Sequence, residues 1–262
     1  MAFATIDGNT LHYEYLTEFG SEPVLVLINS LGTDFRIWLP MIDEITDDWS
    51  ILLHDKRGHG LSDVGEEPYS IERHARDVIG LMDHLLIERA VICGVSVGGM
   101  VAQMIYKLKP DVVEKLVLCD TAAKIGTQDS WNARIATVTE KGVETIADTI
   151  MNVWFTPEFH RNSAAEIKGY RNMLARQPVV GYAGTCAALR DADLTGDASA
   201  IRVPTLVVVG DQDGSTSPDL VKATADLIPG ARFEIIKSCG HIPCVEQPER
   251  LAGLLSDFIN EA

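Results

Sequence analysis

The chain has 262 residues, of which 46% are hydrophobic and 23% are charged, a composition typical of a globular protein with a sizeable core. Its formal net charge of −16 repels the phosphates of nucleic acids and the headgroups of anionic lipids, so neither nucleic acid nor membrane is expected as a partner. The cysteines lack the paired spacing of a metal site, no apolar run approaches the ~20 residues that cross a bilayer, and the first residues do not resemble a signal peptide. We therefore expect a cytoplasmic protein that binds no metal or other cofactor.

The first half of the chain alternates between strand and helix patterns. Two β-type runs, 3–6 and 11–16, flank Asp7-Gly8-Asn9 and predict a hairpin. Apolar runs typical of buried strands follow at 24–28, 50–54, 90–95 and 115–119. Helices are expected over 36–45, over 71–86 with Ser70 as the N-cap, and from the residue after Ser96 to about Lys109. Strands that alternate with helices predict a parallel sheet covered by helices on both faces.

The pattern changes at Thr121. From there to about Leu194 no core strand is predicted, and four helical segments follow instead, at 130–141, 143–152, 157–176 and 180–190. The alternation then resumes with strands at 205–209 and 232–237, a helix opened by Ser217-Pro218 that runs to about Ile228, and a helix from Pro248 to about Asn260. We predict an α/β fold with a mostly parallel, doubly wound sheet. Residues 1–121 and 196–262 form its core domain, and a helical cap of residues 122–195 is inserted before the last two strands.

A glycine-flanked serine stands between one predicted strand and the next helix. The stretch Gly94-Val95-Ser96-Val97-Gly98 has the G-x-S-x-G pattern of a nucleophile elbow, in which a strained turn exposes the serine hydroxyl. The next amide N–H then lies at a helix N-terminus, beside that hydroxyl. The same pattern also suits a glycine-rich turn whose serine only caps the helix, so the remaining chain must decide between the two.

Partners for a nucleophilic serine follow later strands. A serine needs a base to take its proton, and the base needs a third group to fix its tautomer. Asp213 and His241 each follow a predicted strand, and the order Ser96, Asp213, His241 is the one expected of α/β-hydrolases. Asp211 or Asp120 could supply the acid instead, but Asp213 is favoured.

Attack on an ester carbonyl also requires donors for the oxyanion that forms. The amide of Val97, next to the serine, is one expected donor. The second should come from the loop after strand 24–28, where we expect the amide of Leu31. Because backbone donors leave no mark in the side chains, this prediction rests on position alone.

These motifs resemble the α/β-hydrolase superfamily over essentially the whole chain. The stretches that carry the resemblance are Gly94-Val-Ser-Val-Gly98, Asp55-Lys-Arg-Gly-His-Gly-Leu-Ser62, Pro204-Thr-Leu-Val-Val-Val-Gly-Asp-Gln-Asp213 and Gly240-His241. In that superfamily the acid usually follows the strand-end glycine by three positions, which supports Asp213. The oxyanion loop commonly reads His-Gly, whereas this chain has Asn29-Ser30.

Further stretches resemble 3-oxoadipate enol-lactonases, carboxylic-ester hydrolases of the β-ketoadipate pathway of aromatic-compound breakdown. These stretches are Ile28-Asn-Ser-Leu-Gly-Thr-Asp34, Thr121-Ala-Ala-Lys-Ile-Gly-Thr127 and Gly181-Tyr-Ala-Gly-Thr-Cys-Ala-Ala-Leu-Arg-Asp-Ala-Asp-Leu194. The resemblance implies a small lactone substrate that bears a carboxylate, opened through an acyl-enzyme on Ser96. We expect Arg134 to meet that carboxylate, with Trp131 and Trp154 forming the pocket walls. The alternative is that both tryptophans pack the cap onto the core and that Arg134 is solvated.

Other functions fit the same motifs. A carboxylesterase, a carbon–carbon bond hydrolase or a perhydrolase would share the triad, and a ligand-binding receptor can be built on a hydrolase scaffold. A haloalkane dehalogenase is disfavoured, because that chemistry uses an aspartate where Ser96 stands.

Overall fold

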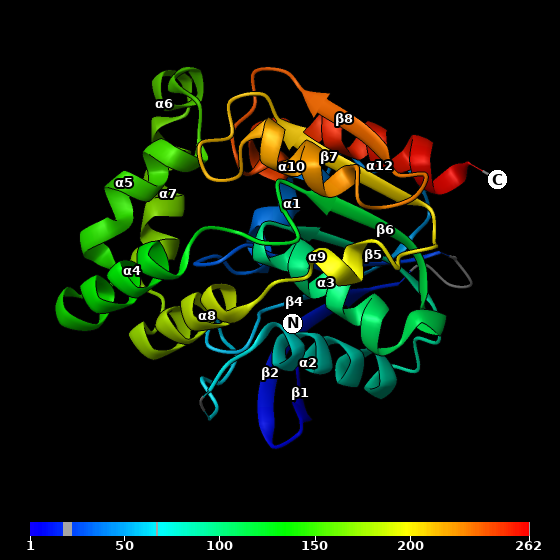
Figure 1. The fold of residues 1–262 in the computed structure, drawn as a ribbon, viewed down its shortest axis with the longest axis horizontal. Coiled ribbons are helices and arrows are strands. Elements are labelled where there is room, and N and C mark those ends of the chain that lie inside the picture. Colours follow the sequence, from blue (N-terminus) through cyan, green and yellow to red (C-terminus); the bar gives the residue numbers. More distant parts are fainter. Residues whose placement is uncertain (18–22, 67, 262) are drawn as a thin grey trace.

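The computed structural model describes residues 1–17, 23–66 and 68–261, and these form an eight-stranded sheet with helices around it (Figure 1). The spatial order of the strands is β1-β2-β4-β3-β5-β6-β7-β8. Their bounds are β1 (Ala2–Ile6), β2 (Asn9–Leu16), β3 (Val24–Ile28), β4 (Ser50–His54), β5 (Ala90–Val95), β6 (Val113–Cys119), β7 (Thr205–Gly210) and β8 (Arg232–Ile236). β2 pairs antiparallel with β1 and β4, whereas the pairs from β4 through β8 are parallel. The predicted mostly parallel sheet is confirmed.

The central strands are buried over their whole length. Every residue of β3, β4, β5 and β7 is buried, and the sequences of β3 and β7 are almost entirely Val, Leu and Ile. Such continuous apolar runs are expected where both faces of a parallel sheet are covered. Because β5, β6, β7 and β8 are parallel neighbours, the loops that follow them leave the sheet at the same edge.

Outside the predicted cap, the helices predicted after Ser70, after Ser96, at Pro218 and at Pro248 are present and begin at those positions, and further short helices occur that the sequence did not predict. Their bounds are η1 (Phe35–Trp38), α1 (Leu39–Ile42), α2 (Ile71–His84), α3 (Val97–Leu108), η2 (Pro110–Val112), α10 (Pro218–Ala225), α11 (Pro243–Glu246) and α12 (Pro248–Asn260). The side chain of Ser70 accepts from the Arg73 amide and caps α2, as predicted. The helix predicted over 36–45 is instead a 3₁₀ turn followed by one short α-helical turn that ends at Ile42.

Six helices lie between β6 and β7 in the chain. They are α4 (Gln128–Lys141), α5 (Glu144–Trp154), α6 (Pro157–Asn162), α7 (Ala164–Ala175), α8 (Val179–Asp191) and α9 (Thr195–Ala198). Figure 1 shows α4 to α8 gathered at one side of the sheet. The prediction of one helix over 157–176 is wrong, because Ser163 leaves helical geometry with φ −128° and ψ 46° and separates α6 from α7. The division into a core domain and a cap stays a prediction.

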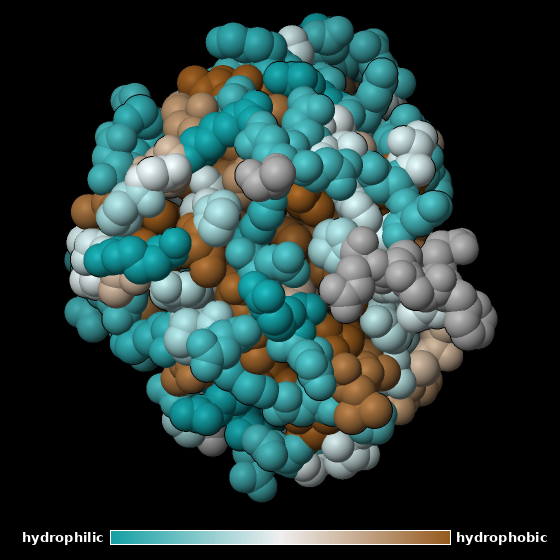
Figure 2. Space-filling model, turned by 90° about the vertical axis from the view of Figure 1, so that its right-hand side faces the viewer, coloured by the Kyte–Doolittle hydropathy of each residue, from teal (hydrophilic) through white to brown (hydrophobic). Residues whose placement is uncertain are grey.

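The face of the molecule turned away from α4 to α8 is mostly hydrophilic. Figure 2 shows this face, with hydrophobic residues visible between larger hydrophilic areas. Among the described residues, no helix is both long and apolar enough to cross a membrane. The five cysteines are all buried and free.

Candidate active site

Ser96 lies on a strained turn between β5 and α3. Its φ of 59° and ψ of −120° place a non-glycine residue in the left-handed half of backbone space, a conformation that costs about 1–3 kcal/mol and is concentrated at functional sites. The flanking glycines make the turn possible: a Cβ on Gly98 would lie 2.1 Å from the carbonyl oxygen of Ile28, and one on Gly94 would lie 2.2 Å from that of Gly98. The geometry has the form of the predicted nucleophile elbow.

The loops after β7 and β8 bring an acid and a histidine together. His241 Nδ1 lies 2.8 Å from Asp213 Oδ2, and both side chains are almost completely buried. The Asp213 carboxylate also accepts from the amides of Ser215 (2.7 Å) and Thr216 (3.0 Å) and from the Thr216 hydroxyl (2.7 Å). Burial raises the pKa of the Asp213 carboxyl, but the positive charge available on His241 and these hydrogen bonds outweigh it, so the net pKa is lowered. Asp213 is therefore held as a carboxylate.

The two other acids considered for this role make different contacts. Asp211 pairs with Lys237 at 3.6 Å and accepts from the Cys239 amide at 3.3 Å. Asp120 is fully buried and accepts from the Gly210 amide at 2.9 Å. The His241 ring donates its hydrogen bond to Asp213, the residue favoured by the spacing.

Two backbone amides beside the serine are available as donors. Among the described residues, neither the Leu31 nor the Val97 N–H has a hydrogen-bond acceptor. Two hydrogen bonds with the loop after β4 hold the loop that carries Leu31. Lys56 Nζ donates to the Ser30 carbonyl at 2.7 Å, and the Gly32 amide donates to His59 Nε2 at 3.1 Å. Unpaired donors on a rigid loop are what oxyanion stabilisation requires.

Lys56 supports the loop that carries Leu31, and the sequence analysis did not predict this. Its side chain is fully buried, and burial lowers its pKa to about 7 against the opposing attraction of Asp55 and Asp34. The position of Lys56 two residues after the end of β4, at the sheet edge where the other loops emerge, is the signal that could have found it.

Ser96 and His241 line a small cavity between the sheet edge and the inserted helices. Its volume is about 20 Å³, which is room for about one water molecule. The predicted residues Trp131, Arg134 and Trp154 all line it. The remaining lining residues are Ser30, Leu31, Ile125, Ile150, Tyr182, Leu189 and Ser215.

Arg134 is the cation in the wall of this cavity. Its guanidinium carbon lies 5.1 Å from the centre of the Trp131 ring, and the indole N–H of Trp131 donates to the Ile125 carbonyl at 2.7 Å. Within the described part of the chain, no carboxylate lies within ion-pair distance of Arg134. A half-buried guanidinium without a counter-ion, held by a ring contact, is suited to an anionic ligand.

The histidine loop is tied to the end of α5. The His241 amide donates to the Trp154 carbonyl at 2.7 Å. Glu246 accepts from the Gly240 amide at 2.8 Å and from the Thr156 amide at 3.1 Å. The inserted helices therefore help to set the position of His241, and Glu246 is a further residue that sequence reasoning missed.

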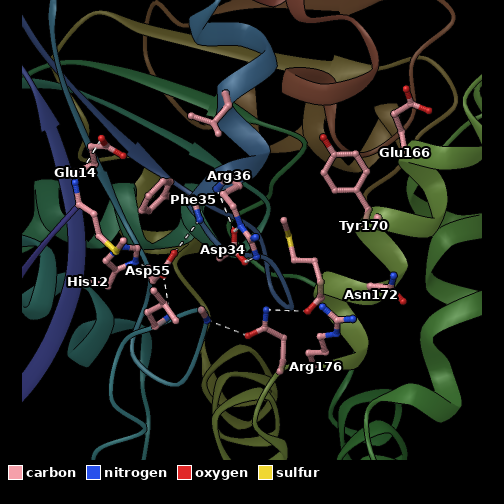
Figure 3. A pocket seen from close by; sticks show the side chains of 17 residues that line it. His12, Glu14, Asp34, Phe35, Arg36, Asp55, Glu166, Tyr170, Asn172 and Arg176 are labelled. Atoms are coloured by element: carbon pink, nitrogen blue, oxygen red, sulfur yellow. Dashed lines mark hydrogen bonds and ion pairs between the residues drawn. The ribbon is translucent and has the colours of Figure 1, made fainter.

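A larger cavity lies elsewhere, between α7 and the side of the core that carries β2 and η1. Its volume is about 770 Å³. Figure 3 shows Glu166, Tyr170, Asn172 and Arg176 on one side and His12, Glu14, Phe35 and Asp55 on the other. Neither Ser96 nor His241 lines it, so the chemistry that these two residues can perform belongs to the smaller cavity.

Asp120, Asp213 and His241 offer donor atoms within 4.8 Å of one another. Such a spacing also suits a metal ion, but Asp213 already accepts four hydrogen bonds, one of them from the His241 ring. The arrangement is that of a hydrogen-bonded network, and we assign no metal to it.

Comparison with known proteins places this geometry in a family. A sequence model of the alpha/beta hydrolase fold matches residues 23–248. 3-oxoadipate enol-lactonases 2 and 1 of Acinetobacter baylyi are 35% and 33% identical to the chain, over 94% and 90% of it and 92% and 88% of the relatives. The crystal structure of the enol-lactonase from Burkholderia xenovorans LB400 superposes with a TM-score of 0.96 at 34% identity, covering 99% of this chain and all of the other.

A thermophilic esterase from Thermogutta terrifontis, solved with malate bound, gives a TM-score of 0.91 at 27% identity and covers 98% of this chain and 97% of the other. The predicted fold class is confirmed, and these relatives support hydrolase activity. The chain belongs to the alpha/beta hydrolase fold family.

Proposed function

We propose that this protein is a serine hydrolase that opens 3-oxoadipate enol-lactone to 3-oxoadipate. Three observations support the proposal: the strained Ser96, the hydrogen-bonded pair of His241 and Asp213, and similarity to enol-lactonases over nearly the whole chain. The observation that favours this substrate over a neutral ester is Arg134. In a chain with a net charge of −16, it places a cation that has no carboxylate partner among the described residues in the wall of the cavity that holds the serine.

The reaction follows from the positions of these groups. His241 takes the proton of the Ser96 hydroxyl as its oxygen attacks the lactone carbonyl, and the amides of Leu31 and Val97 receive the oxyanion. Collapse of this intermediate breaks the ring C–O bond, and the enol oxygen takes the proton from His241. The enol group stays attached to the acyl chain, because both were parts of the same ring. His241 then activates a water that releases the acid from the serine, and the enol relaxes to the ketone.

Substrate binding must change the cavity. Its volume of about 20 Å³ holds roughly one water, which is far less than a lactone ring with its side chain. The side chains of Trp131, Trp154 and Tyr182 therefore have to move apart, or the helices that carry them have to shift, when substrate enters. Arg134 then remains at the wall for the carboxylate.

The test is turnover of 3-oxoadipate enol-lactone, followed by ultraviolet absorbance, with 3-oxoadipate identified by mass spectrometry. Ser96→Ala should lower kcat by roughly four orders of magnitude or more. Arg134→Gln should raise KM by about 10-fold to 100-fold, the value of a charge-assisted hydrogen bond. Arg190→Gln is the control, since that arginine already pairs with Asp191 on α8. Undiminished turnover by Ser96→Ala refutes the mechanism.

The second candidate is an esterase for small carboxylate-bearing esters, which the malate-bound esterase structure favours. The two functions separate in one comparison of kcat/KM for the lactone and for mono-p-nitrophenyl succinate, an ester that bears a carboxylate. An enol-lactonase prefers the lactone by a wide margin, whereas an esterase of the second kind turns over the succinate ester and leaves the lactone largely intact.

A further inference from the structure

Asp120 has an unexplained side-chain oxygen inside the candidate site. The residue directly follows β6, has a positive φ of 47° and is completely buried. Its Oδ1 accepts from the Gly210 amide at 2.9 Å, and its carbonyl oxygen lies 2.8 Å from the Thr216 hydroxyl, whose single hydrogen goes to Asp213. Within the described part of the chain, Oδ2 has no hydrogen-bond partner. A buried carboxylate oxygen in that situation carries a large desolvation cost.

The Asp213 carboxyl lies close to that of Asp120: an oxygen of each and a ring nitrogen of His241 lie within 4.8 Å of one another. Two carboxylates cannot donate to each other, but a proton on one of them makes the pair a donor and an acceptor. Asp213 already accepts four hydrogen bonds and Asp120 receives one at its carboxyl, so the proton belongs on Asp120.

The surrounding charges agree with this assignment. Burial and then the neighbouring Asp213 raise the pKa of the Asp120 carboxyl well above its usual range. Burial likewise raises the pKa of the Cys239 and Cys244 thiols that face it, and contact with Cys93 raises that of Cys119. These thiols stay neutral, and the ionisable partners of Asp120 are therefore Asp213 and His241.

We propose that Asp120 is a positioning residue of the candidate triad, a neutral carboxylic acid that donates its hydrogen to Asp213. This hydrogen bond fixes the carboxylate that orients His241 and withdraws part of its negative charge from the imidazole. Asp120 keeps its own proton throughout, while the catalytic proton passes between Ser96, His241 and the substrate. The effect on catalysis rests on the proposed function. The location of the proton does not, because it is a property of the folded protein.

The experiment is an NMR titration of the His241 imidazole in labelled protein, assigned by the signal that His241→Gln removes. Asp120→Asn keeps a neutral donor of the same shape, so the titration midpoint should stay within about 0.3 pH units of wild type. Asp120→Leu removes the donor and leaves Asp213 more negative, so the midpoint should rise by roughly half a unit or more. Asp211→Asn is the control, because it removes a carboxyl outside the cluster, one that pairs with Lys237.

A fall of about one unit in Asp120→Asn would overturn the proposal, because it would mean that an ionised carboxylate had been removed. An unchanged midpoint in both Asp120 variants would also overturn it. If Asp120→Leu does not fold, the direction of the shift in Asp120→Asn still decides. The pH profile of lactone turnover should move with the imidazole midpoint. If neither the wild type nor any variant turned over the lactone, the proposed function would be refuted. The titration would still report on the Asp120 proton.

Discussion

The buried lysine beneath the oxyanion loop makes the stability of this protein depend on pH in a specific way. Lys56 titrates near 10.5 in an unfolded chain, whereas burial lowers its pKa to about 7 in the folded protein. Between these values the unfolded chain binds one proton more than the folded protein, so the free energy of unfolding rises by about 1.4 kcal/mol per pH unit. Conversely, this stability is lost as the pH falls toward 7.

The substitution Lys56→Met isolates this contribution. From pH 7.5 to 9 the lysine adds about 2 kcal/mol to the free energy of unfolding of the wild type and nothing to that of the variant. The Ser30 carbonyl does not become an orphan, because the Thr33 hydroxyl donates to it at 2.9 Å. Lys56→Met should therefore be more stable than wild type near pH 7.5, and the advantage should shrink toward pH 9.

The assay is urea unfolding of both proteins, followed by circular dichroism at several pH values in this range. The buried thiols contribute equally to both proteins and cancel in the difference. Because the variant loses the tether to Ser30, its kcat for the lactone should fall even where its stability rises. A difference in stability that stays constant from pH 7.5 to 9, or that changes in the opposite direction, would refute the reasoning.

Two further predictions concern the elbow and a buried ion pair. Gly98→Ala should destabilise the fold by about 3 kcal/mol or more, because the new Cβ would lie 2.1 Å from the Ile28 carbonyl oxygen. The control is Gly253→Ala in α12, where no atom lies within 4 Å of the new Cβ; its free energy of unfolding in urea should rise by about 0.5–1 kcal/mol. Asp77→Asn leaves the buried Arg57 without its carboxylate counter-ion and should cost about 3–5 kcal/mol, whereas Asp148→Asn in an exposed pair should leave the urea midpoint unchanged.

Local signals account for the parts of the fold that could be predicted. Apolar runs located the strands, and the glycines around Ser96 predicted the strained turn, because each of these patterns acts within a few residues. The break at Ser163 carries neither proline nor glycine, but Ser163-Ala-Ala-Glu166 has the S-x-x-E spacing typical of a helix N-terminus, a signal that the prediction of one helix did not use.

The parts of the candidate site that follow neighbouring strands could be predicted from the order of the strands. Asp213 and His241 lie together because each follows a strand at the same sheet edge, and Trp131, Arg134 and Trp154 line the cavity that Ser96 shares. The roles assigned to these residues stay predictions.

Glu246 and Lys56 could not be found in this way. Glu246 accepts a hydrogen bond from Thr156, which lies 90 residues away in the sequence, and Lys56 donates to Ser30, which lies 26 residues away. These contacts form only in the folded chain. Both are buried charged side chains whose sequence context resembles that of ordinary loop residues.

The central claim is that His241 makes Ser96 a nucleophile, and covalent labelling tests it most directly. The purified protein is treated with a fluorophosphonate, and the intact mass and the modified peptide are measured. We expect one equivalent of label on Ser96, no label in Ser96→Ala, and labelling slowed by about a hundredfold or more in His241→Ala. Label on another residue, or equal labelling of Ser96 in the presence and absence of His241, would contradict the claim.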